Sequence, residues 1–394
     1  MSEWQEIPLG ELAEIKGGKR LPKGALLTNI HNSHPYIRTT DINNNAVSVG
    51  DLLFVPDEIF PSISRYIVEK NDVIISIVGT IGLCAIIPDS LHLASLTENC
   101  AKIVNVKDKL IDKKYLFYYL TSEDGQAEIE SRNVGSTQPK LPLYNIQGIP
   151  IPLPTLPEQK AIAAVLSSLD DKIDLLHRQN QTLEAMAATL FRQWFVEEAQ
   201  EDWEDGIISE LVEFNPPRKL AKGSAAPYME MASLSTTTFN PEGWYDREFS
   251  SGTKFMNGDT LLARITPCLE NGKTAYVTIL DKDQVGWGST EYIVMRPKGD
   301  LHPFFAYALA RDSDFRDFAE GCLAGSSGRQ RVETNHLMSY KIKIPADDIV
   351  QKFNAVAESI APKLHSNAVQ IRTLEKLRDT LLPKLMSGEV RVEV

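Results

Sequence analysis

The sequence has few of the residues that mark a metal site, a disulfide framework or a membrane segment. Its 394 residues include 4 cysteines, with no CxxC pair, and 7 histidines, with no HxxxH pair. Such isolated cysteines indicate neither a zinc site nor a set of disulfides. The longest apolar stretch, residues 73–88, is interrupted by Ser76, Gly79 and Gly82 and is too short to cross a bilayer. The first residues carry acids and no apolar run, so we expect no signal peptide and a cytoplasmic location.

An excess of positive charge is also lacking. The formal net charge is -12, and none of the segments 1–153, 154–200, 201–345 and 346–394 holds more basic than acidic residues. Domains that bind nucleic acid usually carry a basic surface. The composition therefore predicts weak DNA binding by this chain alone. Basic residues do cluster locally, at 16–20, 218–222 and 329–331.

The chain repeats itself. Leu183-Glu184 and Leu374-Glu375 lie 191 residues apart, as do Pro154 and Pro345, and Thr97-Glu98 recurs as Thr290-Glu291 with a slightly different offset. A period this long is not that of a solenoid repeat. It indicates a globular domain followed by a helix, duplicated in tandem.

Each repeat begins with a mixture of strand and helix patterns. Strands are predicted at 66–68, 73–78, 83–87 and 102–106, and again at 260–264, 274–280 and 292–295, because these runs are rich in β-branched residues. Helices are predicted at 115–120, 123–130 and 303–318. Strands and helices do not alternate as in a doubly wound sheet, so the pattern favours an α+β fold. The predicted parts are 1–153, 154–200, 201–345 and 346–394, two globular and two helical.

A proline-rich strip, residues 149–157, closes the first globular part and is predicted to be an extended linker. Apolar residues then recur at spacings of four and three along 162–194 and 353–385, which is the pattern of a coiled coil. The predicted interface consists of Leu166, Leu169, Ile173, Leu176, Asn180, Leu183, Leu190, Ile360, Leu364, Asn367, Ile371, Leu374 and Leu381.

The two long helices are predicted to pair with each other as an antiparallel coiled coil with pseudo-two-fold symmetry. The alternative is that each amphipathic helix packs separately on its own domain. The second heptad pattern is weakest at Arg378, where Leu377 is expected to take over part of the interface. About 38 residues at roughly 1.5 Å per residue give a rod of about 55–60 Å. Equivalent sites on one face of DNA recur about every 34–36 Å, so such a rod could hold two DNA-reading domains apart.

This arrangement resembles the specificity subunit of type I restriction-modification systems. The resemblance covers essentially the whole chain and is carried by residues 149–176 (IPIPLPTLPEQKAIAAVLSSLDDKIDLL), 181–195 and 374–389, and by two loops, 135–141 (GSTQPKL) and 325–332 (GSSGRQRV). Residues 263–273 (ARITPCLENGK) are similar to one recurrent class of target-recognition domain. The second helix departs from the family pattern where it begins, because residues 348–351 (DIVQ) replace a PEQ-type opening.

The resemblance implies two target-recognition domains, each reading half of a split, asymmetric sequence in double-stranded DNA. It also implies that the helices dock two methyltransferase subunits, which methylate adenine at N6, and that restriction and translocase subunits join them. We expect no catalytic residue, metal or cofactor in this chain; S-adenosylmethionine, ATP and Mg²⁺ are expected on the partner subunits.

The candidate DNA contacts are polar and basic side chains near glycines. Hydroxyl and amide groups can donate to phosphates or base edges, and arginine can bind guanine or phosphate with two hydrogen bonds. For each group, a solvated surface turn is the alternative. The candidates are Ser136, Thr137, Gln138, Lys140, Ser326, Ser327, Arg329, Gln330, Arg331, Arg38, Thr39, Lys19 and Arg20.

Two segments imitate catalytic motifs. Asn215-Pro216-Pro217 is similar to the tetrapeptide of amino-methyltransferases, but Arg218 replaces the aromatic residue that stacks on the base, and the chain has no FxGxG loop. Residues 267–274 resemble a phosphate-binding loop, but Pro267 stands where the first glycine is needed. A methyltransferase with an unusual site and a coiled-coil spacer that reads no DNA remain the alternative functions.

Replacing Lys140 with alanine should weaken DNA binding to a similar degree on all sequences, because a lysine that neutralises a phosphate carries no base information. Titrations of cognate and unrelated duplexes at several salt concentrations measure this effect. An unchanged dependence of the affinity on salt would contradict the phosphate contact.

Overall fold

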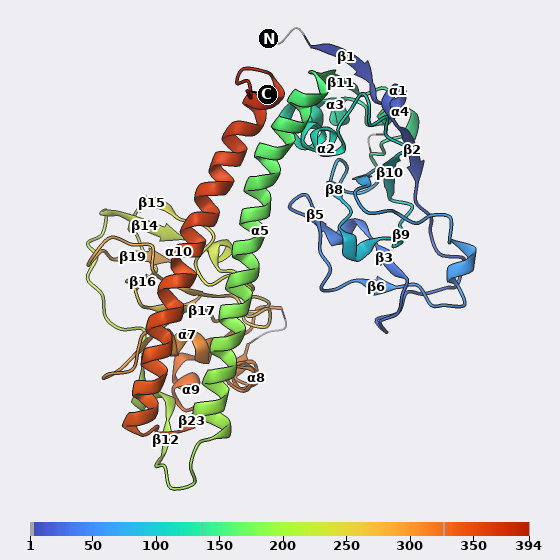
Figure 1. Cartoon of the computed structure of the whole chain (residues 1–394). Coiled ribbons are helices and arrows are strands. Elements are labelled where there is room, and N and C mark those ends of the chain that lie inside the picture. Colours follow the sequence, from blue (N-terminus) through green and yellow to red (C-terminus); the bar gives the residue numbers. More distant parts are fainter. Residues whose placement is uncertain (1–3, 136, 326–327, 394) are drawn as a thin grey trace. The chain divides into compact units, whose positions relative to one another are not determined.

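The computed structural model describes residues 4–135, 137–325 and 328–393. The chain forms two compact units, one made of Met1–Lys172 with Leu374–Val394 and the other of Ile173–Thr373. Each unit combines a globular part with stretches of the two long helices, α5 (Leu156–Arg192) and α10 (Asp347–Met386) (Figure 1). Among the described residues, no helix is long and apolar enough to span a membrane.

The globular part of unit 1 is built around the antiparallel sheet β2-β10-β7-β8, with helices after the last strand of the sheet. A second sheet, β6-β3-β9, contains one parallel pair. The elements of the globular part of unit 1 are β1 (Gln5–Pro8), α1 (Leu9–Leu12), β2 (Glu14–Gly17), β3 (Pro35–Ile37), β4 (Ile42–Asn43), β5 (Ala46–Val47), β6 (Leu53–Phe54), β7 (Val73–Ser76), β8 (Cys84–Ile86), β9 (Ser95–Leu96), β10 (Cys100–Val104), α2 (Lys113–Thr121), α3 (Glu123–Ser131), α4 (Leu143–Gln147) and β11 (Pro150–Leu153).

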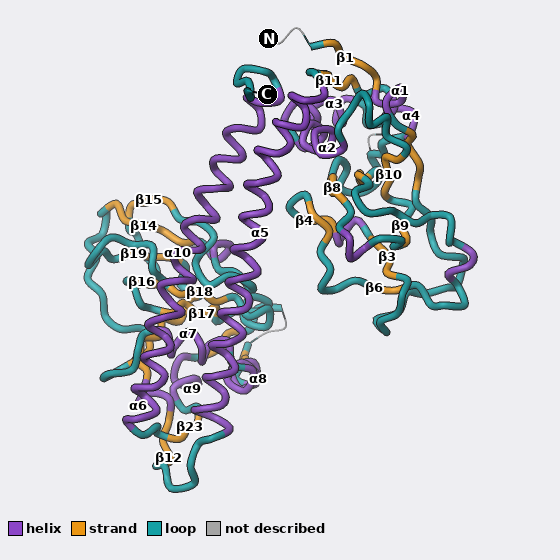
Figure 2. Tube along the Cα trace, viewed as in Figure 1, coloured by secondary structure: helices purple, strands orange, loops and turns teal. Residues whose placement is uncertain are grey.

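The globular part of unit 2 follows the same plan, with the antiparallel sheet β13-β20-β17-β18 and a second sheet β15-β14-β19-β16 (Figure 2). Its elements are β12 (Asp205–Ile207), α6 (Ile208–Leu211), β13 (Val212–Phe214), β14 (Ala225–Met229), β15 (Tyr245–Glu248), β16 (Thr253–Phe255), β17 (Thr260–Ala263), β18 (Thr274–Tyr276), β19 (Gly286–Gly288), β20 (Tyr292–Pro297), α7 (Phe304–Arg311), α8 (Ser313–Gly321), β21 (Leu323–Ala324), β22 (Arg331–Val332), α9 (Thr334–Met338) and β23 (Lys341–Lys343).

The strand registers agree between the two copies. In the second sheets, Tyr36 lies opposite Ser95 in a parallel pair, and Tyr228 lies opposite Trp287 in the corresponding pair. The order of elements and the sheet topology thus confirm the predicted α+β fold, with two globular parts in tandem and a long helix after each. The predicted boundaries of the four sequence segments and their pseudo-two-fold relation stay predictions.

Three local predictions were wrong in detail. Residues 66–68 form a single bridge between Ile67 and Ser95 instead of a strand. The helix predicted at 303–318 is divided into α7 and α8 at Asp312, whose side chain accepts hydrogen bonds from the backbone N–H groups of Asp314 and Phe315 and so caps α8. The proline-rich strip is extended but not a free linker, because β11 pairs with β1.

The two long helices pack antiparallel within each unit. In unit 2, Phe195, which follows α5 in a π-helical turn (Gln193–Glu197), contacts Phe353 near the start of α10, whereas Asn180 lies against Asn367 farther along α10. In unit 1, Asp170 of α5 contacts Arg378 of α10. The predicted pairing of the helices is therefore confirmed. The predicted interface side chains are all buried or half-buried.

Polar contacts interrupt the apolar seam at two points. Asn367 is fully buried and its side-chain amide donates to Asn180 Oδ1 at 2.8 Å. Arg378 donates to Asp170 Oδ1 at 3.0 Å, and the Tyr118 hydroxyl of α2 donates to the other oxygen of Asp170 at 2.7 Å. The expectation that Leu377 replaces Arg378 in the seam was wrong, since Leu377 is 44% exposed. The half-buried side chain of Arg378, with its ion pair to Asp170, occupies this position instead.

In both units the core of the globular part continues into the helix seam. In unit 2, Phe191 and Phe195 pack with Phe305 of α7 and Phe353 of α10, with ring centroids 5.1–5.8 Å apart. In unit 1, Leu166 of α5 and Leu385 of α10 belong to the cluster that covers the sheet. Neither helix pair is a separate rod with its own core.

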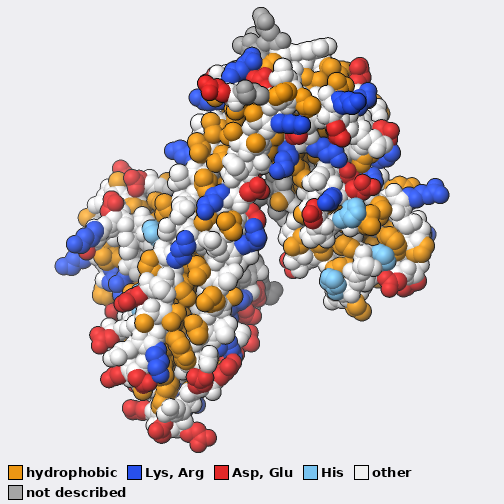
Figure 3. All heavy atoms as spheres, in the orientation of Figure 1, with side chains coloured by type: hydrophobic (Ala, Val, Ile, Leu, Met, Phe, Trp, Pro, Cys, Tyr) orange, Lys and Arg blue, Asp and Glu red, His pale blue; other side chains and the backbone are white. Residues whose placement is uncertain are grey.

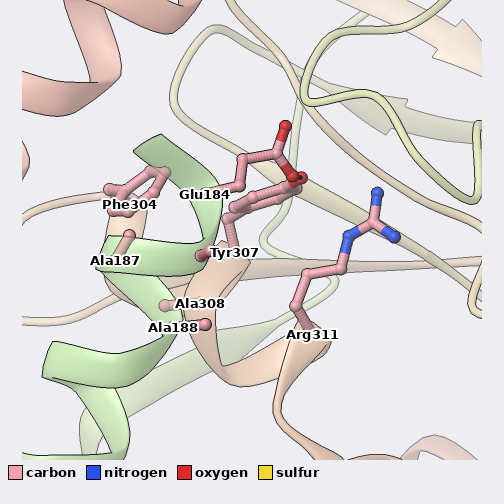
Figure 4. A pocket seen from close by; sticks show the side chains of 8 residues that line it. Glu184, Ala187, Ala188, Phe304, Tyr307, Ala308 and Arg311 are labelled. Atoms are coloured by element: carbon pink, nitrogen blue, oxygen red, sulfur yellow. Dashed lines mark hydrogen bonds between the residues drawn. The ribbon is translucent and has the colours of Figure 1, made fainter. Parts of the chain in front are cut away.

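A small cavity of about 220 Å³ lies where α5 meets α7 in unit 2 (Figure 4). Its walls include Glu184, Phe304, Tyr307, Arg311 and several alanines. The Tyr307 hydroxyl donates to Glu184 Oε2 at 2.7 Å, while Glu184 Oε1 is buried and has no hydrogen-bond partner in the described part of the chain. Burial raises the pKa of Glu184, against the opposing effects of Tyr307 and Arg311.

Replacing Leu176 with alanine should lower the free energy of unfolding by about 2–5 kcal/mol, because this side chain is 1% exposed in the seam and its loss leaves a cavity. The adjacent Leu175 is 40% exposed, so its replacement by alanine is the matched control and should change stability by less than about 0.5 kcal/mol. Urea unfolding followed by circular dichroism compares them. Equal losses would contradict the assignment of Leu176 to the seam.

Replacing Glu184 with glutamine should increase stability relative to the natural protein progressively as the pH rises. The pKa of Glu184 is higher in the folded state than in the unfolded state, so ionisation above the unfolded pKa favours unfolding. This destabilisation is absent below the unfolded pKa and complete above the folded pKa. Urea unfolding of both proteins between pH 4 and pH 8 measures the difference, which should not vary with pH if the carboxyl titrates normally.

Candidate nucleic-acid interface

In unit 1, several predicted DNA contacts converge on the turn that enters β10, residues 97–99. The backbone N–H of Lys19 donates to Leu96 O at 2.8 Å, and that of Thr97 donates to Ile37 O at 3.1 Å, next to Arg38. On the other side, the N–H of Ile77 donates to Asn99 O at 2.8 Å. These residues lie between positions 19 and 99 of the sequence, and the sheets bring their backbones together.

Gly18 allows the segment after β2 to cross this turn. A β-carbon at Gly18 would lie 2.0 Å from Thr97 O, so no other residue fits without a shift of the backbone. The Tyr36 hydroxyl donates to Lys19 O at 2.9 Å and so holds the segment after β2 in place. Lys19 and Arg20 are consequently held at the surface with exposed side chains.

Arg20 is held by a carboxylate. Its Nε donates to Glu98 Oε1 at 2.5 Å, and the Thr97 hydroxyl donates to Glu98 Oε2 at 3.2 Å. Partial burial raises the pKa of Glu98, but the bond from Arg20, a hydrogen bond from the backbone of Glu98 itself and the bond from Thr97 together lower it more, so the net shift is downward. Lys19 Nζ lies 5.6 Å from the centre of the Tyr66 ring.

Arg38 and Thr39 lie on a turn that Arg38 itself closes. The Arg38 side chain donates to both oxygens of Asp41, at 3.0 and 2.6 Å, and to Asp51 O at 3.2 Å. Asp41 is buried. These contacts favour the structural-turn alternative for Arg38, while Thr39 is half-exposed beside it.

Backbone hydrogen bonds join the two ends of the loop at 134–140. Val134 and Lys140 exchange two backbone hydrogen bonds, of 2.8 and 2.9 Å, and Lys140 also forms a bridge with Val78. Thr137, Gln138 and Lys140 are exposed. The predicted contact Ser136 lies outside the described residues.

The corresponding loop of unit 2 is built in the same way. Ala324 of β21 lies opposite Arg331 of β22, and Arg331 forms a bridge with Ile265. The next residue, Val332, donates to Arg264 O at 2.9 Å, just as Leu141 donates to Ile77 O at 3.0 Å in unit 1. Lys140 and Arg331 therefore occupy equivalent places in the two copies.

The unit 2 loop is richer in arginine. Arg331 donates to both oxygens of Glu291 at 2.6–2.9 Å, and this interaction lowers the pKa of Glu291. Gln330 exchanges hydrogen bonds with Thr266, one through its N–H and one through its carbonyl oxygen, each at 3.1 Å. Arg329 is exposed. Ser326 and Ser327 lie outside the described residues.

The two acids, Glu98 and Glu291, are members of the site that the sequence did not single out. The repeated Thr-Glu dipeptide was the available signal, but it served only to align the copies. The backbone hydrogen bonds of the sheets align the two copies one residue differently. Asn99 O accepts from the N–H of Ile77, and Glu291 O accepts from the N–H of Arg264 at the same place in the other sheet, so Glu291 corresponds to Asn99 and not to Glu98. The side chains of Glu98 and Glu291 thus reach the same turn from neighbouring positions.

The two segments that imitate catalytic motifs have structural contacts. Asn215 exchanges hydrogen bonds with Val294 of β20 through its N–H and its side-chain oxygen, at 2.7 and 2.9 Å. Arg218 donates to the buried Asp259. Within residues 4–135, 137–325 and 328–393, no group of three or more His, Cys, Asp or Glu side chains is arranged to hold a metal ion.

Comparison with known proteins gives a consistent result. Residues 1–185 match the family described as "Type I restriction modification DNA specificity domain". The MjaIX specificity subunit of Methanocaldococcus jannaschii is 24% identical, over 99% of this chain and 94% of that protein. The HindI specificity subunit of Haemophilus influenzae is 22% identical, over 99% of this chain and 100% of that protein.

A solved structure has the same fold. The S subunit of a type I restriction-modification system from M. genitalium is similar with a TM-score of 0.62 and 17% identity, over 97% of this chain and 96% of that chain. The family match and these relatives lead to one conclusion: residues 1–185 belong to the family of type I restriction-modification DNA specificity domains, and the chain as a whole is similar to type I specificity subunits.

Proposed function

We propose that this chain reads a bipartite, asymmetric sequence in double-stranded DNA and carries that specificity to a methyltransferase and restriction complex. Residues 1–153 and 201–345 are the two target-recognition domains, and each reads one half of the sequence. Residues 154–200 and 346–394 are the helical spacers. The chain is not catalytic in this proposal.

The equivalent placement of Lys140 and Arg331 is the observation that carries the proposal. Lys140 forms a backbone bridge with the segment after β7, and Arg331 forms one with the segment after β17. Each loop presents exposed polar or basic side chains next to that bridge. A spacer without a reading role would not need this arrangement twice. Figure 3 shows basic side chains scattered among acidic ones on the visible face, with no continuous basic surface.

The helices supply the spacing in this proposal. α5 has 37 residues and α10 has 40, which at about 1.5 Å per residue correspond to about 55 and 60 Å. Half-sites on successive turns of DNA lie about 34–36 Å apart, so helices of this length suffice to separate two reading domains.

An outward face of α5 in unit 2 suits a partner subunit. It forms a shallow groove of about 730 Å³ lined by Arg178, Gln181, Thr182, Ala185, Met186, Thr189 and Leu190, and Met186 is 51% exposed. Hydrophobic side chains gather along the helices on the face seen in Figure 3. We assign this face to one of two methyltransferase subunits, since large exposed hydrophobic side chains commonly mark an interface.

The partners complete the chemistry. The methyltransferase subunits bind S-adenosylmethionine, and the restriction and translocase subunits use ATP and Mg²⁺. If partners also contribute most of the contacts with phosphates, the net charge of -12 on this chain is compatible with DNA binding by the complex.

Methylation mapping of DNA from a host that expresses this chain with its neighbouring methyltransferase tests the proposal. We expect a split, asymmetric motif with N6-methyladenine in both halves, and its loss when the gene for this chain is deleted. Stable assembly with the methyltransferase but no methylated motif would contradict the reading role and favour the spacer alternative.

A further inference from the structure

In both globular parts, one of the arginines predicted to contact DNA is held by a glutamate at the turn that enters the second strand of the antiparallel sheet, β10 or β20. Arg20 is bound to Glu98, and Arg331 is bound to Glu291. The acids come from equivalent turns, whereas the arginines come from different segments, one after β2 and the other in β22. The same pairing thus arises in the two copies from different parts of the chain.

In each pair the arginine lies outside and the carboxylate inside. The exposed fractions of the side chains are 79% for Arg20 against 30% for Glu98, and 42% for Arg331 against 22% for Glu291. The bonds of Arg331 use its Nε and Nη2 atoms, on one edge of the planar guanidinium. The carboxylate therefore supports that edge and leaves the edge formed by Nη1 and Nη2 for another partner.

The stability of the fold does not account for these pairs. The pair of Arg296 with Asp259 has a carboxylate that is completely buried, and it fixes the end of β20 to the turn before β17. The side chains of Arg20 and Arg331 are 79% and 42% exposed, against 30% for Arg296, and neither Glu98 nor Glu291 is completely buried. Ion pairs that remain in contact with solvent contribute little to stability. A role toward a ligand at the surface explains their placement better.

Charge neutralisation has a direct consequence for binding to DNA. An unpaired arginine attracts any phosphate backbone, and this attraction is independent of sequence. An arginine paired with a carboxylate loses most of that attraction, but its remaining N–H groups can still form two hydrogen bonds with O6 and N7 of guanine. Such a pair favours a matching base edge over an arbitrary phosphate.

We propose that Glu98 and Glu291 are specificity-determining residues: each orients one arginine for a base edge and suppresses its binding to non-cognate phosphates. This inference rests on the proposed reading of DNA by both globular parts. Glu291 has the stronger influence, because Arg331 donates to both of its oxygens, whereas Arg20 donates to one oxygen of Glu98. The glutamates act through the arginines and are positioning residues.

The test uses the complete chain assembled with its methyltransferase subunits. Affinities are measured for a duplex that carries the mapped motif and for a duplex of the same length and composition with both halves scrambled, at several salt concentrations. The variant is Glu291→Gln. The control is Glu248→Gln, which removes the same charge from an exposed residue of β15.

For the scrambled duplex, Glu291→Gln should bind about fivefold more tightly at about 0.15 M salt and should show a salt slope steeper by about 0.9, as for one additional phosphate contact. The affinity for the cognate duplex should rise less, so the ratio of cognate to scrambled affinity falls. Glu248→Gln should leave this ratio unchanged. Glu98→Gln should act in the same direction through Arg20.

Two results would overturn the inference. Equal effects of Glu291→Gln and Glu248→Gln would show that only the total charge matters. A loss of cognate affinity with no change on the scrambled duplex would show that Glu291 contacts a base itself. Glu291→Asp keeps the charge but shortens the side chain, so it should retain the salt slope of the natural protein and bind the cognate duplex less tightly.

The experiment has one control for the folding of the variants and another for DNA reading by the natural complex. Thermal unfolding of each variant shows whether the domain is intact, and Glu291→Asp is the variant to use if Glu291→Gln does not fold. A natural complex that binds both duplexes equally well would contradict the proposed reading of DNA. Failure of that proposal is thereby distinguished from failure of the inference about the glutamates.

Discussion

The burial of one apolar seam between α5 and α10 is the constraint on which each unit depends. The seam is not insulated from the globular parts, because its residues belong to the same clusters as the sheet and the short helices. In unit 2 the aromatic contacts of Phe191, Phe195, Phe305 and Phe353 join three helical segments in one core. A surface loop is attached to its sheet, and the sheet packs on the long helices of the same unit. The position of the loop therefore depends on the helices. The proposed reading of DNA would use this support, since base contacts depend on well-defined positions.

The sequence predicted regular, periodic features better than features set by distant contacts. The heptads identified both long helices and their buried residues because the period of a helix is written locally. Residues 66–68 have the composition of a strand, but only Ile67 finds a pairing partner, so tertiary pairing overrides the propensity. Leu377 was misplaced for a similar reason: hydrophobicity alone could not show that Arg378 would be satisfied in the seam by Asp170 and that Leu377 would face solvent.

The candidate site was predicted in part. The loops with Lys140 and Arg331 were found from glycine and charge, and the structure gives them equivalent anchoring. Their acidic neighbours were missed, because the pairing of Arg20 with Glu98 spans 78 residues and that of Arg331 with Glu291 spans 40. Arg38 looked the same as Arg20 in sequence, yet it closes its own turn through Asp41. Which arginine remains at the surface depends on the carboxylates that the fold brings near, and this is not a local property.

The ribbon of β1 with β11, and its counterpart of β12 with β23, has one more consequence. Each ribbon joins the first strand of a globular part to its last strand, immediately before a long helix. The chain thus enters and leaves each globular part at the same place. Loops between the two strands that do not pack on the helices can therefore change in length or sequence without moving the point where the helix begins. In evolutionary terms, the surface loops of each globular part can diverge while its connection to the long helix is preserved.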